Sequence, residues 1–164
     1  MSTHPHHAIR LAGPWTLSLA VLGSDAISVH RTDDLRINLT KPDVEAWHGW
    51  FRQQLLDLKP ILQPNWQIQV LCQRKFNQPT GLTAAQRLSV EVEFFGPSSC
   101  NRTVEVNGKL LNGNVDGDLR FAAELERLES FNSLTIGLLV PEEDFDLSDV
   151  KVPPFRSARL VIQE

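Results

Sequence analysis

The segment that decides the fold reads Leu88-Ser89-Val90-Glu91-Val92-Glu93-Phe94, with an apolar side chain at every second position. Successive side chains of a β-strand point to opposite faces. The segment therefore predicts a strand with one face in the core and the other in water. One buried face and one solvated face are typical of antiparallel sheets.

The same two-residue period recurs on both sides of this segment. It predicts further strands over 14–22, 66–76, 104–106, 109–111, 119–125, 134–140 and 157–163, with weaker ones over 26–30 and 35–39. Asn107-Gly108 supplies the positive φ angles of a tight hairpin turn between two of these strands. Many short strands separated by turn signals predict an all-β fold, an antiparallel β-sandwich of jelly-roll type.

One segment, residues 41–58, departs from the two-residue period. Its apolar residues recur at gaps of three and four, which places them on one face of a helix. These residues are Val44, Trp47, Phe51, Leu55 and Leu58. Lys59-Pro60 then ends the pattern. We expect one helix that packs on an end or a face of the sandwich.

The chain length and charge limit the class of protein. A chain of 164 residues is typical of one domain, and we expect a flexible N-terminal arm over 1–8 and a single jelly-roll domain over 9–164. The 16 basic and 20 acidic residues give a net charge of −4, which disfavours a nucleic-acid partner. No apolar stretch is long enough to span a membrane, so no membrane partner is expected. The N-terminus lacks the pattern of a secretory signal, so the expected location is cytoplasmic.

A family resemblance emerges from the order of the motifs. An Arg74-x-Phe76 strand precedes strand 88–94, a hairpin at Asn107-Gly108 follows, and an Asn132-x-Leu134 motif opens a late strand. This order resembles the sugar-binding jelly-roll domain of glycoside hydrolase family 2 enzymes, and more broadly the galactose-binding-domain-like fold, over about residues 10–163. In those enzymes a separate barrel domain holds the catalytic carboxylates, and we do not expect one within these 164 residues. The resemblance therefore implies a stand-alone, non-catalytic module.

Carbohydrate binding requires an aromatic platform and planar polar groups around it. Trp50 lies at the edge of the apolar stripe of the predicted helix and is the best candidate for an exposed aromatic. Arg74 falls on the inward face of strand 66–76, where it either points into a binding cleft or forms a structural pair with a buried carboxylate. Asn77 follows it and is a candidate recognition group. The predicted ligand-binding residues are therefore Trp50, Arg74 and Asn77.

A calcium site is a second candidate. Asn114, Asp116 and Asp118 place side-chain oxygens at alternate positions, and calcium prefers oxygen ligands. The related jelly-roll modules often carry a structural calcium, so the resemblance supports this reading. The alternative is a turn-rich loop, since Asn, Asp and Gly all favour turns.

Catalysis has no comparable support, and we predict no catalytic residue. No Gly-x-Ser-x-Gly elbow is present, and Cys72 falls on an inward strand face, where a thiol is inert. The acidic stretch 141–154 is read as a solvated loop. The predicted function is a non-catalytic binding module, with carbohydrate as the first candidate ligand. The alternative is a protein-interaction or structural module that forms a homodimer or part of a larger assembly, and an enzyme ranks third.

Overall fold

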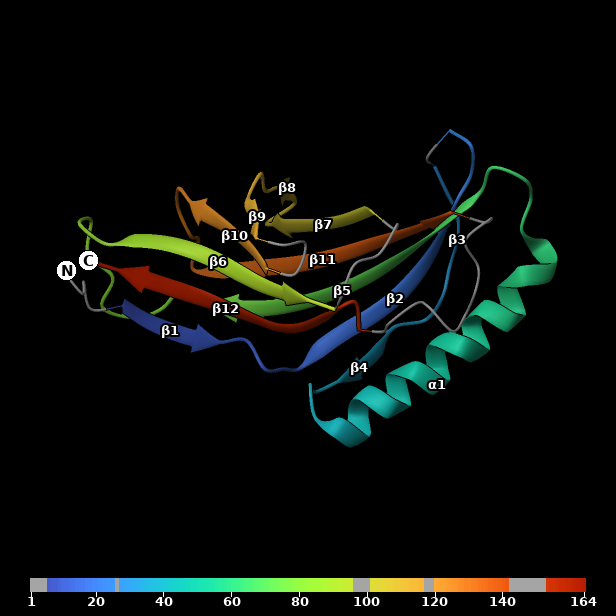
Figure 1. Cartoon of the computed structure of the whole chain (residues 1–164), viewed down its shortest axis with the longest axis horizontal. Helices are drawn as coiled ribbons and strands as arrows, with labels where there is room; N and C mark the ends of the chain where they lie inside the picture. Colours follow the sequence, from blue (N-terminus) through green and yellow to red (C-terminus); the bar gives the residue numbers. More distant parts are fainter. Residues whose placement is uncertain (1–5, 26, 96–100, 117–119, 142–152) are drawn as a thin grey trace.

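A computed structural model of the chain describes residues 6–25, 27–95, 101–116, 120–141 and 153–164. In these residues the chain forms two antiparallel sheets, with a single long helix along one side (Figure 1). The fold class predicted from the sequence, an antiparallel β-sandwich with one helix, is confirmed.

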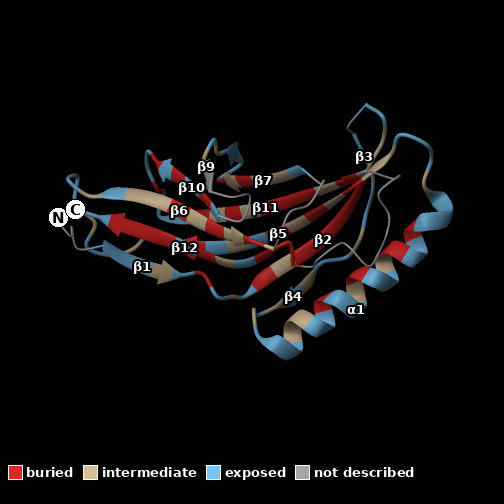
Figure 2. Ribbon diagram, in the orientation of Figure 1, coloured by how far each residue is buried: buried red, intermediate tan, exposed pale blue. Residues whose placement is uncertain are grey.

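The smaller sheet has five strands in the described part of the chain. Their spatial order is β1 (His6–Arg10), β12 (Phe155–Gln163), β6 (Arg87–Phe94), β10 (Arg120–Leu125) and β9 (Asn114–Asp116). The two-residue period appears directly as burial: Val90, Val92 and Phe94 of β6 are buried, whereas the residues between them are only partly covered (Figure 2).

The larger sheet places its longest strands at its centre. Its order is β3 (Ser28–Arg31), β2 (Trp15–Leu22), β5 (Gln67–Asn77), β11 (Phe131–Pro141), β7 (Asn101–Val106) and β8 (Lys109–Leu110), and β4 (Leu35–Ile37) also pairs with β2. Asn107 and Gly108 both have positive φ angles, which confirms the predicted hairpin turn between β7 and β8.

The helix α1 (Lys41–Leu58) lies where the sequence pattern predicted it and continues into the short 3-10 turn η1 (Lys59–Ile61). It buries Trp47, Phe51, Leu55 and Leu58 in the same core as the strands. In the described residues, no helix combines the length and apolar content needed to cross a membrane.

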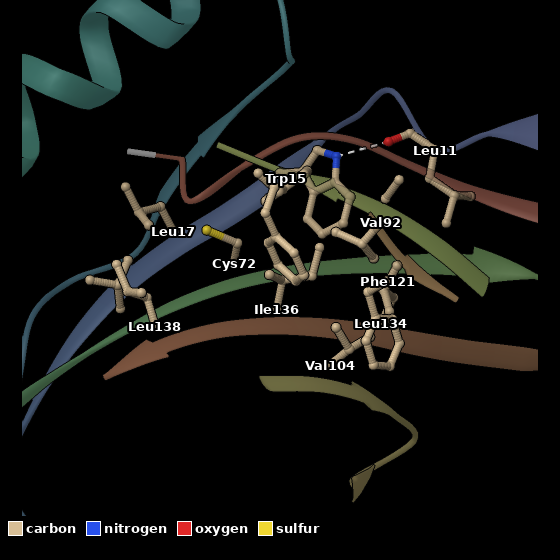
Figure 3. Close-up of a cluster of buried hydrophobic side chains, with 14 of the residues drawn as sticks. Leu11, Trp15, Leu17, Cys72, Val92, Val104, Phe121, Leu134, Ile136 and Leu138 are labelled. Carbon is tan, nitrogen blue, oxygen red and sulfur yellow. Dashed lines mark hydrogen bonds between the residues drawn. The ribbon is translucent and has the colours of Figure 1, made fainter. Parts of the chain in front are cut away.

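The core centres on Trp15. Its side chain is fully buried, and its indole Nε1 donates a 2.9 Å hydrogen bond to the carbonyl oxygen of Leu11 (Figure 3). The centroid of its ring lies 4.6 Å from that of the Phe155 ring. A buried indole N–H without an acceptor would be costly, so this bond allows a large aromatic side chain to fill the space between the sheets.

Two strands differ from the sequence expectation. Residues 6–8, assigned to the N-terminal arm, are the first residues of β1, which pairs with β12 from His6 opposite Gln163 to Arg10 opposite Arg159. Residues 114–116, read as a candidate calcium loop or a turn, form β9 against β10. Both strands lie at sheet edges, where pairing uses backbone groups and requires no apolar alternation.

Candidate ligand-binding site

A pocket of about 740 Å³ lies where β5 ends and β11 begins. Both sheets contribute to it: Ile9 and Leu160 belong to the five-stranded sheet, and the rest of the pocket comes mainly from β5, β11 and the turn after β7. The other lining residues are Leu11, Arg74, Lys75, Phe76, Asn77, Pro79, Asn107, Phe131, Asn132 and Ser133. No carboxylate stands among these described residues, whereas two cationic residues do.

The pairing register of β5 and β11 determines the position of each of their pocket residues on the sheet. Arg74 pairs with Leu134, and this pair shares the inner face of the sheet with Cys72. Asn77 pairs with Phe131 at the last position of β5 and the first of β11. Phe131 is 78% exposed, a high value for a phenylalanine. Arg74 therefore sits on the inside of the pocket, and Asn77 and Phe131 form its rim.

Arg74 is the electrostatically unusual member of the pocket. Its Nε and Nη1 atoms are shielded from water and have no hydrogen-bond partner among the residues that the structure describes. Partial burial lowers the pKa of its guanidinium, because desolvation disfavours the charged form. Of the two readings left open by the sequence, the structural ion pair is not found in the described part of the chain. The arginine instead lines an open pocket.

Other arginines of the described chain show the more usual arrangement. Arg159 donates from Nε to the Glu91 carboxylate at 2.7 Å, and Arg31 and Arg87 lie 3.7 and 3.9 Å from the carboxylates of Asp34 and Glu124. Within the described part of the chain, Arg74 is thus half-buried without a counter-charge, while these more exposed arginines are paired. A charge left in that state costs free energy unless another molecule supplies the partner.

Two asparagines fix the rim of the pocket. The buried Asn132 accepts hydrogen bonds at Oδ1 from Asn107 Nδ2 at 3.0 Å and from the Glu129 amide at 2.9 Å, and it donates from Nδ2 to the Glu129 carbonyl at 2.7 Å. Asn107 in turn accepts from the amide of Ser133 at 2.8 Å. Their side chains are committed to holding the β7–β8 turn against the start of β11, which makes this end of the pocket rigid.

The structure brings together two of the three predicted ligand-binding residues. Arg74 and Asn77 line the same pocket, whereas Trp50 lies on α1, partly buried against the core, and does not line it. Sequence reasoning missed Phe131 as an aromatic candidate because the predicted strand began at residue 134. The available signal was Phe131-Asn132-Ser133, which directly precedes the alternating segment.

The predicted calcium ligands are only partly within the described chain. Asp118 lies outside the described residues. The backbones of Asn114 and Asp116 pair with Ala122 and Arg120, and their side chains are not described. Across the residues that are described, no cluster of three or more His, Cys, Asp or Glu side chains could hold a metal ion. The calcium site stays a prediction.

Cys72 fits the expectation for a structural thiol. It is fully buried, and desolvation raises the pKa of its thiol far above the ordinary value. A nucleophilic cysteine needs the thiolate form, which burial of this thiol disfavours. The acidic stretch 141–154 lies almost entirely outside the described residues.

Comparison with known proteins supports the fold. No family model and no curated protein matches the chain. Among solved structures, an FMN-binding β-glucuronidase from Faecalibacterium prausnitzii L2-6 aligns with a TM-score of 0.52 and 19% identity over 98% of this chain and 23% of its own. The β-glucuronidase of Bifidobacterium dentium aligns with a TM-score of 0.52 and 15% identity, over 99% of this chain and 31% of the enzyme. The β-glucuronidase of an uncultured Clostridium sp. aligns with a TM-score of 0.51 and 15% identity, over 99% of this chain and 30% of the enzyme.

The chain thus spans less than a third of the length of these β-glucuronidases, although nearly all of it aligns. At 15–19% identity the likeness concerns the fold. It confirms the resemblance that the order of sequence motifs indicated: the chain has the fold of a jelly-roll segment found in glycoside hydrolase family 2 enzymes.

Proposed function

We propose that this chain is a non-catalytic binding module whose pocket at the end of β5 takes a carbohydrate. The observation that carries the proposal is an exposed aromatic ring and a guanidinium at one pocket. Phe131 stands at the rim, and Arg74, whose Nε and Nη1 atoms have no hydrogen-bond partner among the described residues, lies inside. A sugar ring presents a C–H face that packs on an aromatic ring, and its hydroxyls bond to planar polar groups.

The dimensions and the rigidity of the site agree with this function. Ligand pockets usually have volumes of roughly 300–1,000 Å³, a range that includes this one. The Asn107–Asn132 bonds hold the rim in place before a ligand arrives, which reduces the entropy lost on binding. The likeness of the chain to part of several β-glucuronidases supports a carbohydrate-related domain.

Glycan-array binding followed by calorimetry on the strongest hit tests the proposal. We expect Phe131→Ala to weaken binding at least tenfold, because the ring supplies the stacking surface. The matched control is Ile61→Ala, which removes a 52%-exposed apolar side chain outside the pocket and is expected to leave binding unchanged. A blank array, or equal effects of the two variants, contradicts the proposal.

Two further arms address the alternatives. Repeating the array with calcium and with a chelator tests whether binding depends on a metal ion. If it does, substitution of Asn114, Asp116 or Asp118 by Ala should also abolish binding. Light scattering of the purified chain tests the alternative of a homodimeric interaction module. A dimer on a chain that binds no glycan favours that alternative, and a monomer that binds glycans favours the carbohydrate module.

A further inference from the structure

We propose that the carbohydrate bound in this pocket carries a carboxylate, which forms an ion pair with the guanidinium of Arg74. This inference rests on the proposed function and makes it more specific, because it names the class of sugar. A sugar acid and its neutral counterpart differ at one carbon, which carries a carboxylate in the first and a hydroxymethyl group in the second.

The first argument is the missing counter-charge. Arg74 lines the pocket with Nε and Nη1 unpaired, and none of the described lining residues is acidic. Apolar neighbours such as Ile9 and Leu160 also line the pocket and reduce the water available to solvate the charge. The lowered pKa of Arg74 reflects this desolvation. A carboxylate bound in the pocket would supply the counter-charge that none of the described lining residues provides.

The second argument is that the charge of the pocket lining is opposite in sign to the net charge of the chain. The whole chain carries a net charge of −4, which on average repels anions. The pocket lining departs from this average, with Arg74 and Lys75 present and no carboxylate among the described residues. A local reversal of sign concentrates anions at one place on a surface that otherwise discourages them, which gives selectivity as well as attraction.

The third argument is the choice of arginine. Its guanidinium is planar, holds its charge at every physiological pH and presents donors that match the two oxygens of a carboxylate. A neutral sugar would leave the cation unpaired, because hydroxyl groups supply no counter-charge. Asn77 and Phe131 at the rim then have the complementary task of contacting the uncharged part of the sugar.

The experiment compares matched ligands on matched variants. Calorimetry measures glucuronate- and galacturonate-containing oligosaccharides against their glucose and galactose counterparts, with a 6-sulfated oligosaccharide as a third arm. The variants are Arg74→Gln and the control Arg52→Gln, which removes an exposed arginine of α1 outside the pocket. Thermal melting checks that each variant is folded.

We expect the wild-type chain to bind a uronate-containing ligand at least tenfold more tightly than its neutral counterpart and than the sulfated one. Arg74→Gln should abolish this preference and retain the weaker affinity for the neutral sugar, and Arg52→Gln should behave as wild type. Added salt should weaken binding of the acidic ligand alone.

The outcomes separate the two proposals. Equal binding of acidic and neutral sugars overturns the carboxylate inference and leaves the carbohydrate function in place. Binding of the sulfated sugar as tightly as the uronate shows recognition of any anion, which also overturns it. If no oligosaccharide binds, the proposed function and this inference both fail. The wild-type comparison alone is decisive, so the test does not depend on a variant that folds.

Discussion

Arg74 lies directly opposite Leu134 in the antiparallel register of β5 and β11, so a guanidinium shares the inner face of the sheet with a fully buried leucine. The strand keeps its two-residue period through this position, since Cys72 before it and Phe76 after it are both buried. The charge is tolerated because the pocket opens at this end of the sandwich.

Replacing the charge should not weaken the fold. In Arg74→Met an apolar side chain of similar length replaces a cation whose Nε and Nη1 atoms have no hydrogen-bond partner among the described residues. We expect the free energy of unfolding to stay the same or to rise by up to about 1 kcal/mol, a modest gain because the side chain is only half-buried. Urea denaturation measures this change. A loss of more than about 1 kcal/mol would mean that Arg74 is structural and has an unrecognised partner in the fold.

Asn132 should be important for stability in the way that Arg74 is not. Asn132→Ala removes three hydrogen bonds and leaves the Glu129 amide and carbonyl groups without their partner. We expect a loss of about 2–3 kcal/mol, because each unsatisfied buried group costs about 1–3 kcal/mol and some regain water. The matched control is Asn77→Ala at an exposed position, expected to change stability by less than about 0.5 kcal/mol. Equal effects in denaturant melts would refute the role given to Asn132.

The raised pKa of Cys72 predicts a loss of stability in alkaline solution. Folding keeps the thiol protonated, whereas the unfolded chain releases this proton above about pH 8.5. The stability from this group is therefore fully present below that pH and declines above it, with a slope that approaches about 1.4 kcal/mol per pH unit. The chain contains no tyrosine, and lysine titrates near pH 10.4, so the useful window is about pH 8.5–10.

Urea unfolding at several pH values, in a Cys100→Ser background, measures this slope. Adding Cys72→Ala should lower stability at neutral pH and flatten the alkaline slope, because the titrating group is gone. A slope that persists in the Cys72→Ala chain would assign the alkaline sensitivity to another group.

Gly137 and Thr103 form a tightly packed pair across β11 and β7. They are direct partners in the register, and a Cβ added to Gly137 would overlap the Thr103 Oγ1 atom. We expect Gly137→Ala to destabilise the fold by about 1–3 kcal/mol through overpacking. Thr103→Ala in the same chain should recover most of that loss, since it removes the overlapping atom. A double-mutant cycle by denaturation measures the coupling, and strict additivity would exclude the overlap as the cause.

Most strands and the helix followed from the sequence, because burial at every second or every third and fourth position is a local property of the chain. Strand 88–94, the Asn107-Gly108 turn and the helix 41–58 all appear where their patterns predicted them. The edge strands β1 and β9 could not be predicted from the sequence, because they are held by backbone pairing with β12 and β10 and carry no such pattern.

The candidate site could be predicted only in part. The inward position of Arg74 follows from the strand period, and Asn77 from its place after that strand. Trp50 was the most plausible aromatic by helix geometry, yet none of the described lining residues of the pocket belongs to α1. The aromatic residue at the rim of the pocket is instead Phe131. The eleven-residue pairing between β5 and β11 places it opposite Asn77.

The sequence by itself therefore determined the fold class, the position of the helix and the presence of one charged residue on a buried strand face. Each of these depends on neighbours a few positions away. The tertiary structure alone decided that Arg74, Phe131 and Asn132 meet at one pocket and that no described carboxylate joins them. The register between strands distant in the chain fixes those meetings, and that register results from packing the whole core at once.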